Sequence, residues 1–321
     1  MEPPNDADVF LQQALTTIPV IIRNWLPHTI IENTLLMTIY KNFHLMSNNT
    51  IATNFRDHCM VPGTSPDDYK HRIITLRNGE RVLTSIRFKG LNVKQPFVEV
   101  EHRSFRLESI EQVKALAQEV CEHYRIFEAR SIRLFSWAGS ILDRVHDPQI
   151  ECDCRLLVAP LGVLRRHRLT DRNYDRIRLE RAENLGFYPL YSQAYDDFHR
   201  DHPELVEAVP KEPENSMLIY VYESQVFNIL IDGEWAGLVV ADDYADSIWR
   251  GYMIADEILA KAYRGQGYAV PMQKHLVEQI HGHDSAFLLG TISPNNLPSM
   301  RTATHSGRVD VGGSFFISID G

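Results

Sequence analysis

Cysteine is scarce in this chain, and its four cysteines are too few for a disulfide scaffold. Cys152 and Cys154 could chelate a metal together, but no second Cys or His pair stands at zinc spacing, so we expect reduced thiols and no metal. The sequence also lacks low-complexity runs and any apolar stretch long enough to cross a bilayer. Its first residues are acidic, whereas a secretory signal begins with basic ones. We therefore expect a cytoplasmic protein with no membrane partner.

Positive charge is also in short supply, with 33 lysines and arginines against 42 aspartates and glutamates and a net charge of −9. A general nucleic-acid binder takes much of its affinity from cationic patches, so this balance argues against a nucleic-acid partner. It is compatible with a cationic amine as a substrate. The exception is the basic stretch 165–176, which we interpret as a solvated connector between domains.

The length of 321 residues predicts two domains, because single hydrophobic cores stop growing at roughly 250–300 residues. Apolar residues make up 44% of the chain and charged residues 23%, as in globular proteins. We place an N-terminal α+β domain at residues 1–165 and a second domain at residues 172–321. The sequence leaves open whether the chain forms a homodimer.

The first half predicts a mixture of helices and strands. Apolar residues recur at helical spacing from Ile31 to Phe43 and again after Ser109, which is a good N-cap residue. Alternating apolar patterns, with Asn78 and Gly79 as a turn, predict hairpin strands. The expected strands are residues 19–25, 73–76, 81–88, 97–102 and 131–136.

The second half predicts a similar order of elements. Residues 188–199 have helical spacing, and the proline-bounded segment 203–213 is expected to be a connector. Asp232 and Gly233 form a typical hairpin turn. The expected strands are residues 175–181, 216–222, 226–231, 235–240, 251–259 and 286–292.

A turn with two glycines connects the predicted strand 251–259 to an amphipathic helix. Gly265 and Gly267 permit positive φ angles and a close approach of the backbone to a ligand. The first amides of the following helix have no intrahelical partner, and such amides bind phosphate. Arg264 adds a cation at the rim. The turn therefore predicts an anion site, with a purely structural turn as the alternative.

Two other nucleotide-binding motifs do not fit this turn. A P-loop needs Lys-Ser/Thr after its glycines, and a dinucleotide fingerprint needs a third glycine. The pattern that remains, Arg264-x-x-Gly267-x-Ala269, resembles the pyrophosphate-binding motif of the GCN5-related N-acetyltransferases. This superfamily uses acetyl-coenzyme A as its acetyl donor.

A second motif of the same family follows the predicted strand 286–292. The family usually has an asparagine, a small residue three positions later and a glycine eleven positions later, and this chain has Asn296, Ser299 and Gly307. Ala303 stands where many members have a tyrosine, and an arginine, Arg308, replaces the usual aromatic residue after the glycine.

The resemblance implies a mixed, mostly antiparallel sheet flanked by helices, and acetyl-coenzyme A as co-substrate. The main chain of Leu259, Ala260 and Lys261 would bind the pantetheine arm, and Asn296 and Ser299 would line the opposite wall of the cleft. The pyrophosphate would lie on the turn formed by Arg264, Gly265, Gln266, Gly267, Tyr268 and Ala269.

The first half has no comparable turn, because no glycine occurs between His102 and Ile110. We consider two interpretations of this half. It is either a degenerate copy of the acetyltransferase fold, in which case two such domains stand in tandem, or an unrelated α+β domain. Neither interpretation gives it a catalytic role.

Acetyl transfer to an amine needs a base, and something to protonate the departing thiolate. Asp256 and Glu257 are adjacent carboxylates that a strand sends to opposite faces, so only one is expected to face the cleft. We favour Glu257, which shares the face of Leu259. Near the position of the missing tyrosine, the candidate acids are Ser299, Thr302, Thr304 and His305. Tyr252 and Tyr268 are further candidates, and a base that acts through water fits as well.

Three functions remain open from the sequence. The first is an N-acetyltransferase for a primary amine of a small molecule or peptide. The second is an acyl-coenzyme A sensor or scaffold without turnover, which the missing tyrosine would allow. The third is acyl transfer to another acceptor, such as the thiol of a carrier protein.

Overall fold

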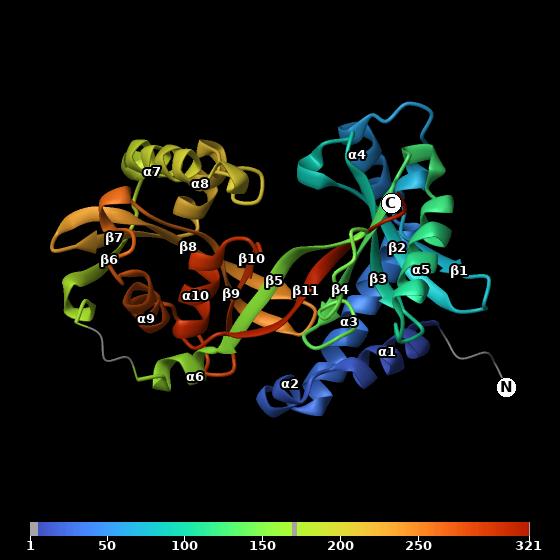
Figure 1. Ribbon diagram of the computed structural model, residues 1–321, viewed down its shortest axis with the longest axis horizontal. Coiled ribbons are helices and arrows are strands. Elements are labelled where there is room, and N and C mark those ends of the chain that lie inside the picture. The colour runs from blue at the N-terminus through green and yellow to red at the C-terminus, as the bar shows by residue number, and fades with distance from the viewer. Residues whose placement is uncertain (1–5, 169–171, 321) are drawn as a thin grey trace. The chain divides into compact units, whose positions relative to one another are not determined.

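The computed structural model of the protein describes residues 6–168 and 172–320. The chain forms two compact units. The first unit comprises the chain up to Asp153 together with the stretch from Gly312 onward, and the second unit comprises Cys154–Val311. In Figure 1, the red end of β11 (Val309–Ser318) lies beside the green strand β4 (Ser131–Trp137), with which it pairs. The last residues of the chain thus complete the first unit.

The first unit combines helices and strands. It begins with four helices, and a fifth lies between its third and fourth strands. The helices are α1 (Asp6–Thr17), α2 (Val20–Trp25), α3 (His28–Ser47), α4 (Asn49–Cys59) and α5 (Ile110–Glu122). The strands are β1 (Arg72–Thr75), β2 (Arg81–Phe88), β3 (Pro96–Arg103), β4 and the end of β11.

The strands of the first unit lie in the order β1-β2-β3-β4-β11. Neighbours are antiparallel except β3 and β4, which run parallel. The β2–β3 register shifts between Leu83 and Thr84, which marks a β-bulge in β3. Val98 and Val100 of this strand belong to the same hydrophobic core as the buried residues of α5.

The second unit begins in β5 (Ile150–Pro160) and ends early in β11. Its other strands are β6 (Ile177–Arg181), β7 (Val226–Ile231), β8 (Glu234–Asp246), β9 (Trp249–Leu259) and β10 (Phe287–Ile292). Its helices are α6 (Leu161–Arg166), α7 (Tyr188–Asp201), α8 (Glu214–Tyr222), α9 (Ala269–Gln279) and α10 (Leu297–His305).

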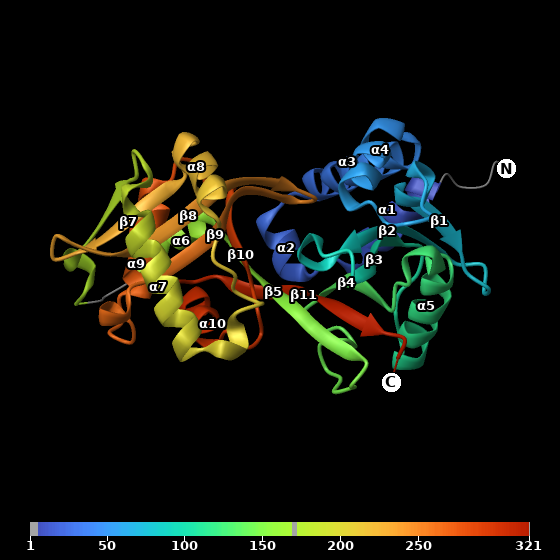
Figure 2. The same cartoon turned by 90° about the horizontal axis from the view of Figure 1, so that it is seen from above.

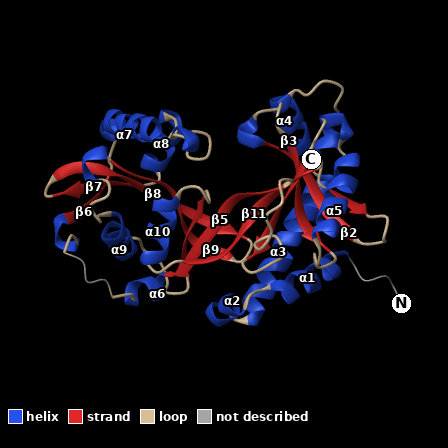
Figure 3. Ribbon diagram, viewed as in Figure 1, coloured by secondary structure: helices blue, strands red, loops and turns tan. Residues whose placement is uncertain are grey.

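The strands of the second unit lie in the order β5-β10-β9-β8-β7-β6. Only β9 and β10 run parallel, and the other neighbours are antiparallel. Figure 1 shows α7 and α8 on one side of β7 and β8 and α9 on the other, and Figure 2 gives the view from above. Figure 3 shows the same layers of blue helix and red strand. The predicted α+β class, with a mostly antiparallel sheet between helices, is confirmed.

Most predicted elements are present with small shifts at their ends. The strands expected at 73–76, 81–88 and 97–102 are β1 to β3, and the helix expected after Ser109 is α5, whose N-cap Oγ accepts the amide of Gln112 at 3.1 Å. Among the described residues, no helix is both long enough and apolar enough to cross a bilayer.

Two predicted strands are helices instead. Residues 20–25 of the first form α2, and the carbonyl of its N-cap Pro19 accepts the amides of Ile22 and Arg23 at 3.1 and 3.2 Å. Residues 216–222 lie in α8, which follows Pro213. Both segments are short apolar runs rich in β-branched or aromatic residues, and periodicity cannot separate helix from strand in such runs. Pro19 and Pro213 are the N-cap residues of these two helices.

Candidate functional site

The glycine turn, residues 264–269, lies between the end of β9 and the start of α9. Gly265 has φ of +70° and Gly267 has φ of +84°, so both glycines adopt the left-handed conformation that the sequence predicts. Among the residues that the structure describes, the amides of residues 266–269 donate to no acceptor. Several N–H groups therefore stand unpaired at a helix N-terminus, which is the arrangement that binds anions.

Asn173 supports the glycine turn from the side. Its Nδ2 donates to the carbonyl of Gln266 at 2.9 Å, and a Cβ added to Gly267 would lie 3.4 Å from the same nitrogen. The carbonyl is thus turned toward Asn173 and away from the unpaired amides. Any side chain at position 267 would be strained by the backbone angle as well as crowded.

Arg264 does not extend into solvent at the rim of the turn. Its Nε donates to the carbonyl of Leu259 at 2.7 Å and its Nη2 donates to the carbonyl of Ala194 at 2.7 Å. The guanidinium also lies over the ring of Phe198, with 5.5 Å between its carbon and the ring centroid. These contacts hold the end of β9 against α7, so Arg264 shapes the turn.

Two other arginines lie beside the glycine turn. Arg172 and Arg176 line a hollow of about 370 Å³ with Asn173, Gln266 and Tyr268. Arg176 is paired with Asp232 and lies over the Tyr268 ring at 5.2 Å. From the sequence, both arginines were expected in a connector, because the approach of residues so distant in sequence leaves no local signal.

The main chain before the turn is partly engaged. The amide of Ala260 donates to the carbonyl of Ala236 at 2.8 Å, and the carbonyl of Leu259 accepts from Arg264. Lys261 Nζ pairs with Asp201 at 2.8 Å. The remaining lone pair of the Leu259 carbonyl can still accept from a ligand.

The parallel strands β9 and β10 pair only over Gly251–Met253 and Phe287–Leu289, and then diverge. The register of β9 on β8 shifts at Val240 and Ala241, so β9 carries a bulge just before Asp256. A cavity of about 260 Å³ opens where the strands part. This interstrand cavity is lined by residues 254–257, 290–293, 208–210 and 212, and by Tyr195, Gln273, Asn296, Ser299 and Arg308.

Asp256 and Glu257 lie on opposite faces of β9, yet both line the interstrand cavity. The expectation that only one of them faces the cleft is wrong, because the cavity passes between the two diverging strands. Asp256 is buried toward α7, where Tyr191 and Tyr195 donate to its two oxygens at 2.5 and 2.6 Å. Burial raises the pKa of Asp256 to about 6, against these two hydrogen bonds.

Glu257 points toward α9. Its Oε2 accepts from Nε2 of Gln273 at 2.6 Å, and no hydrogen bond to its Oε1 occurs among the described residues. Burial raises the pKa of Glu257, and the positive charge of Arg308 opposes that shift. The carboxylate is therefore fixed by one oxygen while the other can accept a proton.

The second predicted motif lies around α10. The Oδ1 of Asn296 caps this helix by accepting the amide of Ser299 at 3.3 Å, and both residues line the interstrand cavity. Ala303 is completely buried. His305 is exposed at the end of the helix and does not line the cavity.

The helix that follows β3 in the first unit begins differently from α9. The Oγ of Ser109 accepts the amide of Gln112, and Oε1 of Gln112 accepts the amide of Glu108 at 2.9 Å. Side chains thus satisfy the amides at the start of α5, in line with the missing glycine.

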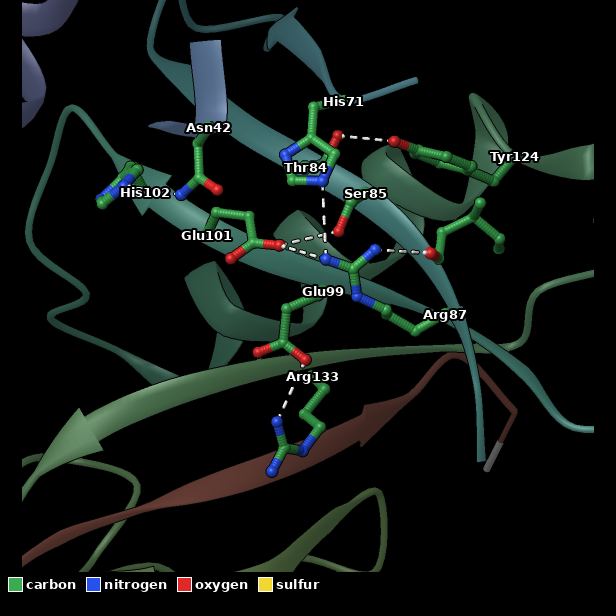
Figure 4. A network of polar contacts seen from close by, with 11 residues as sticks. Asn42, His71, Thr84, Ser85, Arg87, Glu99, Glu101, His102, Tyr124 and Arg133 are labelled. Atoms are coloured by element: carbon green, nitrogen blue, oxygen red, sulfur yellow. Dashed lines mark hydrogen bonds and ion pairs between the residues drawn. The ribbon is translucent and has the colours of Figure 1, made fainter. Parts of the chain in front are cut away.

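Charged side chains lie near the bulge of β3 in the first unit (Figure 4). Glu101 accepts from Arg87 Nη2 at 3.1 Å, and Glu99 accepts from Arg133 Nη1 at 3.1 Å. Burial raises the pKa of Glu99 to about 7. Each guanidinium thus has a carboxylate partner, which favours a structural network over a ligand site.

Similarity to known proteins rests on the structure. No family model and no curated protein matches the sequence. A GCN5-related N-acetyltransferase from Sphaerobacter thermophilus superposes with a TM-score of 0.50 and 10% identity, over 80% of this chain and 83% of that one. The fold is that of the GCN5-related N-acetyltransferases. A GNAT-family acetyltransferase from Colwellia psychrerythraea has a TM-score of 0.46 and 14% identity, over 84% of this chain and 94% of its own.

The two motifs that the sequence predicts lie at the glycine turn and around α10, which follows β10. Identities this low show a shared fold, so an activity has to be argued from the residues of the site. Among the described residues, no group of three His, Cys, Asp or Glu side chains could hold a metal ion.

Proposed function

We propose that the protein is an acetyl-coenzyme A-dependent N-acetyltransferase that acts on a primary amine, with its site in the second unit. The observation that carries this proposal is the row of unpaired amides at residues 266–269, at the start of the helix that also reaches the interstrand cavity. The amides would hold a pyrophosphate at the helix N-terminus. The cavity offers a place for the reacting groups.

Arg172 adds positive charge near the unpaired amides, whereas the charge of Arg176 is balanced by its pair with Asp232. Phosphate groups bind well to guanidinium groups, which offer planar sets of N–H donors. The main chain at Leu259–Lys261 would follow the pantetheine arm from the turn toward the cavity, and Asn296 and Ser299 would line its other wall. Acetyl-coenzyme A supplies the activated acetyl group when it is bound there.

Glu257 is our candidate for the base. Its Oε1 would accept a proton from the amine nitrogen as that nitrogen bonds to the thioester carbon and the carbon–sulfur bond breaks. Solvent then returns a proton to the sulfur, so the products are the amide and free coenzyme A thiol. Asp256 is less suited to this step, because tyrosine hydroxyls hold both of its oxygens.

No ionisable side chain of α10 lines the cavity, so α10 offers no acid to protonate the departing thiolate. Ser299 lines the cavity and offers a hydroxyl, whereas His305 lies outside the lining. We propose that Ser299 orders a water that delivers this proton. A direct transfer from the serine hydroxyl would be slow because its pKa is high.

A second candidate function is favoured by one observation. Ala303 fills the core where many GCN5-related enzymes have a tyrosine, so α10 brings no acid to the cavity. A protein that binds acyl-coenzyme A as a sensor, without turnover, would need the glycine turn but no acid. Transfer to the thiol of a carrier protein is the remaining alternative.

One experiment separates these functions. The protein is incubated with acetyl-coenzyme A and a panel of amines, release of free thiol is followed, and binding of coenzyme A is measured by calorimetry. Thiol release that depends on an amine supports the transferase. Binding without release over the whole panel supports the sensor, and release only with a thiol acceptor supports the third function. The absence of both binding and release overturns the proposal.

A further inference from the structure

Arg308 is a buried cation with few partners. It follows Gly307 at the start of β11, and its side chain lines the interstrand cavity with 4% of the residue exposed. Its Nη2 donates to Oε1 of Gln273 at 3.0 Å, whereas its Nε has no hydrogen-bond partner among the described residues. A guanidinium carries five N–H donors, and leaving such donors unpaired in the interior is costly.

Among the described residues, no carboxylate forms an ion pair with the buried Arg308. Glu257 attracts Arg308 electrostatically, but the contact between them runs through Gln273, which donates to the carboxylate and accepts from the guanidinium. Burial lowers the pKa of Arg308 to about 10, so the side chain stays charged at neutral pH. A buried charge without a direct counter-ion points to an anionic ligand.

The end of the Arg308 side chain lies close to Gly290 of β10. A Cβ added to Gly290 would lie 2.9 Å from Nη1 of Arg308, so a methyl group at position 290 would push the guanidinium aside. The lining of the interstrand cavity thus combines one guanidinium, that of Arg308, with the carboxyl groups of Glu212, Asp256 and Glu257.

We infer that the acceptor of this enzyme is a small molecule that carries a carboxylate close to its amine, such as an α-amino acid. Arg308 binds the carboxylate, and Glu257 faces the amine. This inference rests on the proposed function and specifies its substrate class. It gives Arg308 the role of a specificity-determining residue.

The charges favour a carboxylate over a phosphate. Three carboxyl groups line the cavity against one guanidinium, and a phosphate with nearly two negative charges would be repelled more strongly than a carboxylate with one. A cavity of about 260 Å³ lies at the lower end of the range for ligand pockets, which suits a small acceptor.

Matched ligand pairs test the inference without the need for turnover. Alanine, lysine and phenylalanine are titrated by calorimetry into the protein saturated with coenzyme A. Their decarboxylated partners, ethylamine, cadaverine and phenethylamine, and the three amino-acid amides are titrated in the same way. We expect at least one amino acid to bind ten-fold or more tightly than both its decarboxylated and its amide partner. Equal affinities within every set, or no binding of any amino acid, would overturn the inference.

Variants then assign the preference to the guanidinium. Arg308→Gln should remove the preference for the carboxylate, and Arg308→Lys should keep part of it. Arg155→Gln is the matched control, because Arg155 is also buried in the second unit but pairs with Asp310 at 2.9 Å and does not line the cavity. If Arg308→Gln does not fold, Gly290→Ala decides, since the added methyl displaces the guanidinium without removing it. A folded variant that keeps the full preference overturns the inference.

Turnover separates this inference from the proposed function. If no amine releases thiol while amino acids still bind through Arg308, the transferase proposal fails and the carboxylate site stands. If Arg308→Gln lowers the rate equally for amines with and without a carboxylate, Arg308 acts on the thioester and the inference fails while the transferase stands.

Discussion

Nε2 of Gln273 lies 2.6 Å from Oε2 of Glu257, so the helix that begins at the glycine turn also fixes the carboxylate on β9. Gln273 lies little more than one turn into α9. An anion bound at the start of this helix and a carboxylate held by its second turn are therefore positioned by one rigid element. Under the proposed function, binding at the turn would set the distance between coenzyme A and Glu257.

Replacement of Gly267 by valine should abolish binding of coenzyme A. The backbone there has φ of +84°, and the new side chain would meet Asn173 beside the unpaired amides. Calorimetry measures binding and circular dichroism checks the fold. The control is Gly233→Val in the turn between β7 and β8, where φ is +89° and the backbone penalty is similar. Normal binding by a folded Gly267→Val protein would place the site elsewhere.

Each chain should bind one coenzyme A. The start of α5 in the first unit is capped by Ser109 and Gln112, so its amides cannot receive a pyrophosphate as those of α9 can. Calorimetric titration of the full chain gives the stoichiometry. A second site of similar affinity would contradict the assignment of the first unit as a non-binding partner.

Glu257→Gln should lower turnover near pH 7 by about a hundredfold to ten-thousandfold, the usual loss when a general base is removed. Much of that loss should return at high pH, where the free amine is deprotonated. The pH dependence of kcat and the binding of coenzyme A are measured together. Asp256→Asn is the comparison, and a larger effect there than in Glu257→Gln would transfer the role of base to Asp256.

His305→Ala should leave kcat within about twofold of wild type, since His305 is exposed and outside the cavity lining. Ser299→Ala should lower kcat about tenfold or more if this serine orders the water that protonates the thiolate. Both rates are followed by thiol release. A strong effect of His305→Ala with an unchanged Ser299→Ala would reverse the two roles.

His71 should make the protein less stable in mild acid. Burial, and next the charge of Arg87, lower the pKa of this side chain to about 4 (Figure 4). The unfolded chain takes up the proton near pH 6.5 and the folded protein only near pH 4, so the free energy of unfolding falls as the pH falls between these values. Relative to His71→Gln, wild type should lose about 2 kcal/mol between pH 7 and pH 5.

Urea unfolding at the two pH values measures this difference, and His305→Gln serves as the exposed control. A parallel decline of wild type and His71→Gln would show that other groups set the acid stability. Glu99 acts in the opposite direction, because its raised pKa of about 7 favours the folded state at low pH, so the comparison with the variant is needed.

The glycine turn was predictable because its signals are local. Gly265 and Gly267 stand between an apolar strand and an amphipathic helix, and each feature can be read from neighbouring residues. The helices α2 and α8 were not predictable in this way, since short runs such as residues 216–222 fit a strand as well as a helix. In α8, Met217 is buried while both Leu218 and Ile219 are exposed, a pattern that breaks strand alternation and is visible only in the folded chain.

The interstrand cavity depends on features that no short stretch of sequence carries. The bulge before Asp256 arises from the pairing of β9 with β8, and it lets two adjacent carboxylates line one cavity. In the sequence, Arg308 stands out only because it replaces the aromatic residue that the family usually has there. Its burial beside Gly290 and Gln273 depends on three elements that meet only in the folded chain.

The pairing of β11 with β4 has a consequence for how the protein is made. Residues 312–318 complete the sheet of the first unit, yet the ribosome adds them after the whole second unit. Until these residues are synthesised, the edge of β4 that pairs with β11 stays unpaired. An exposed edge strand is a site for aggregation. A stop codon before residue 312 would therefore damage the half of the protein that is synthesised first.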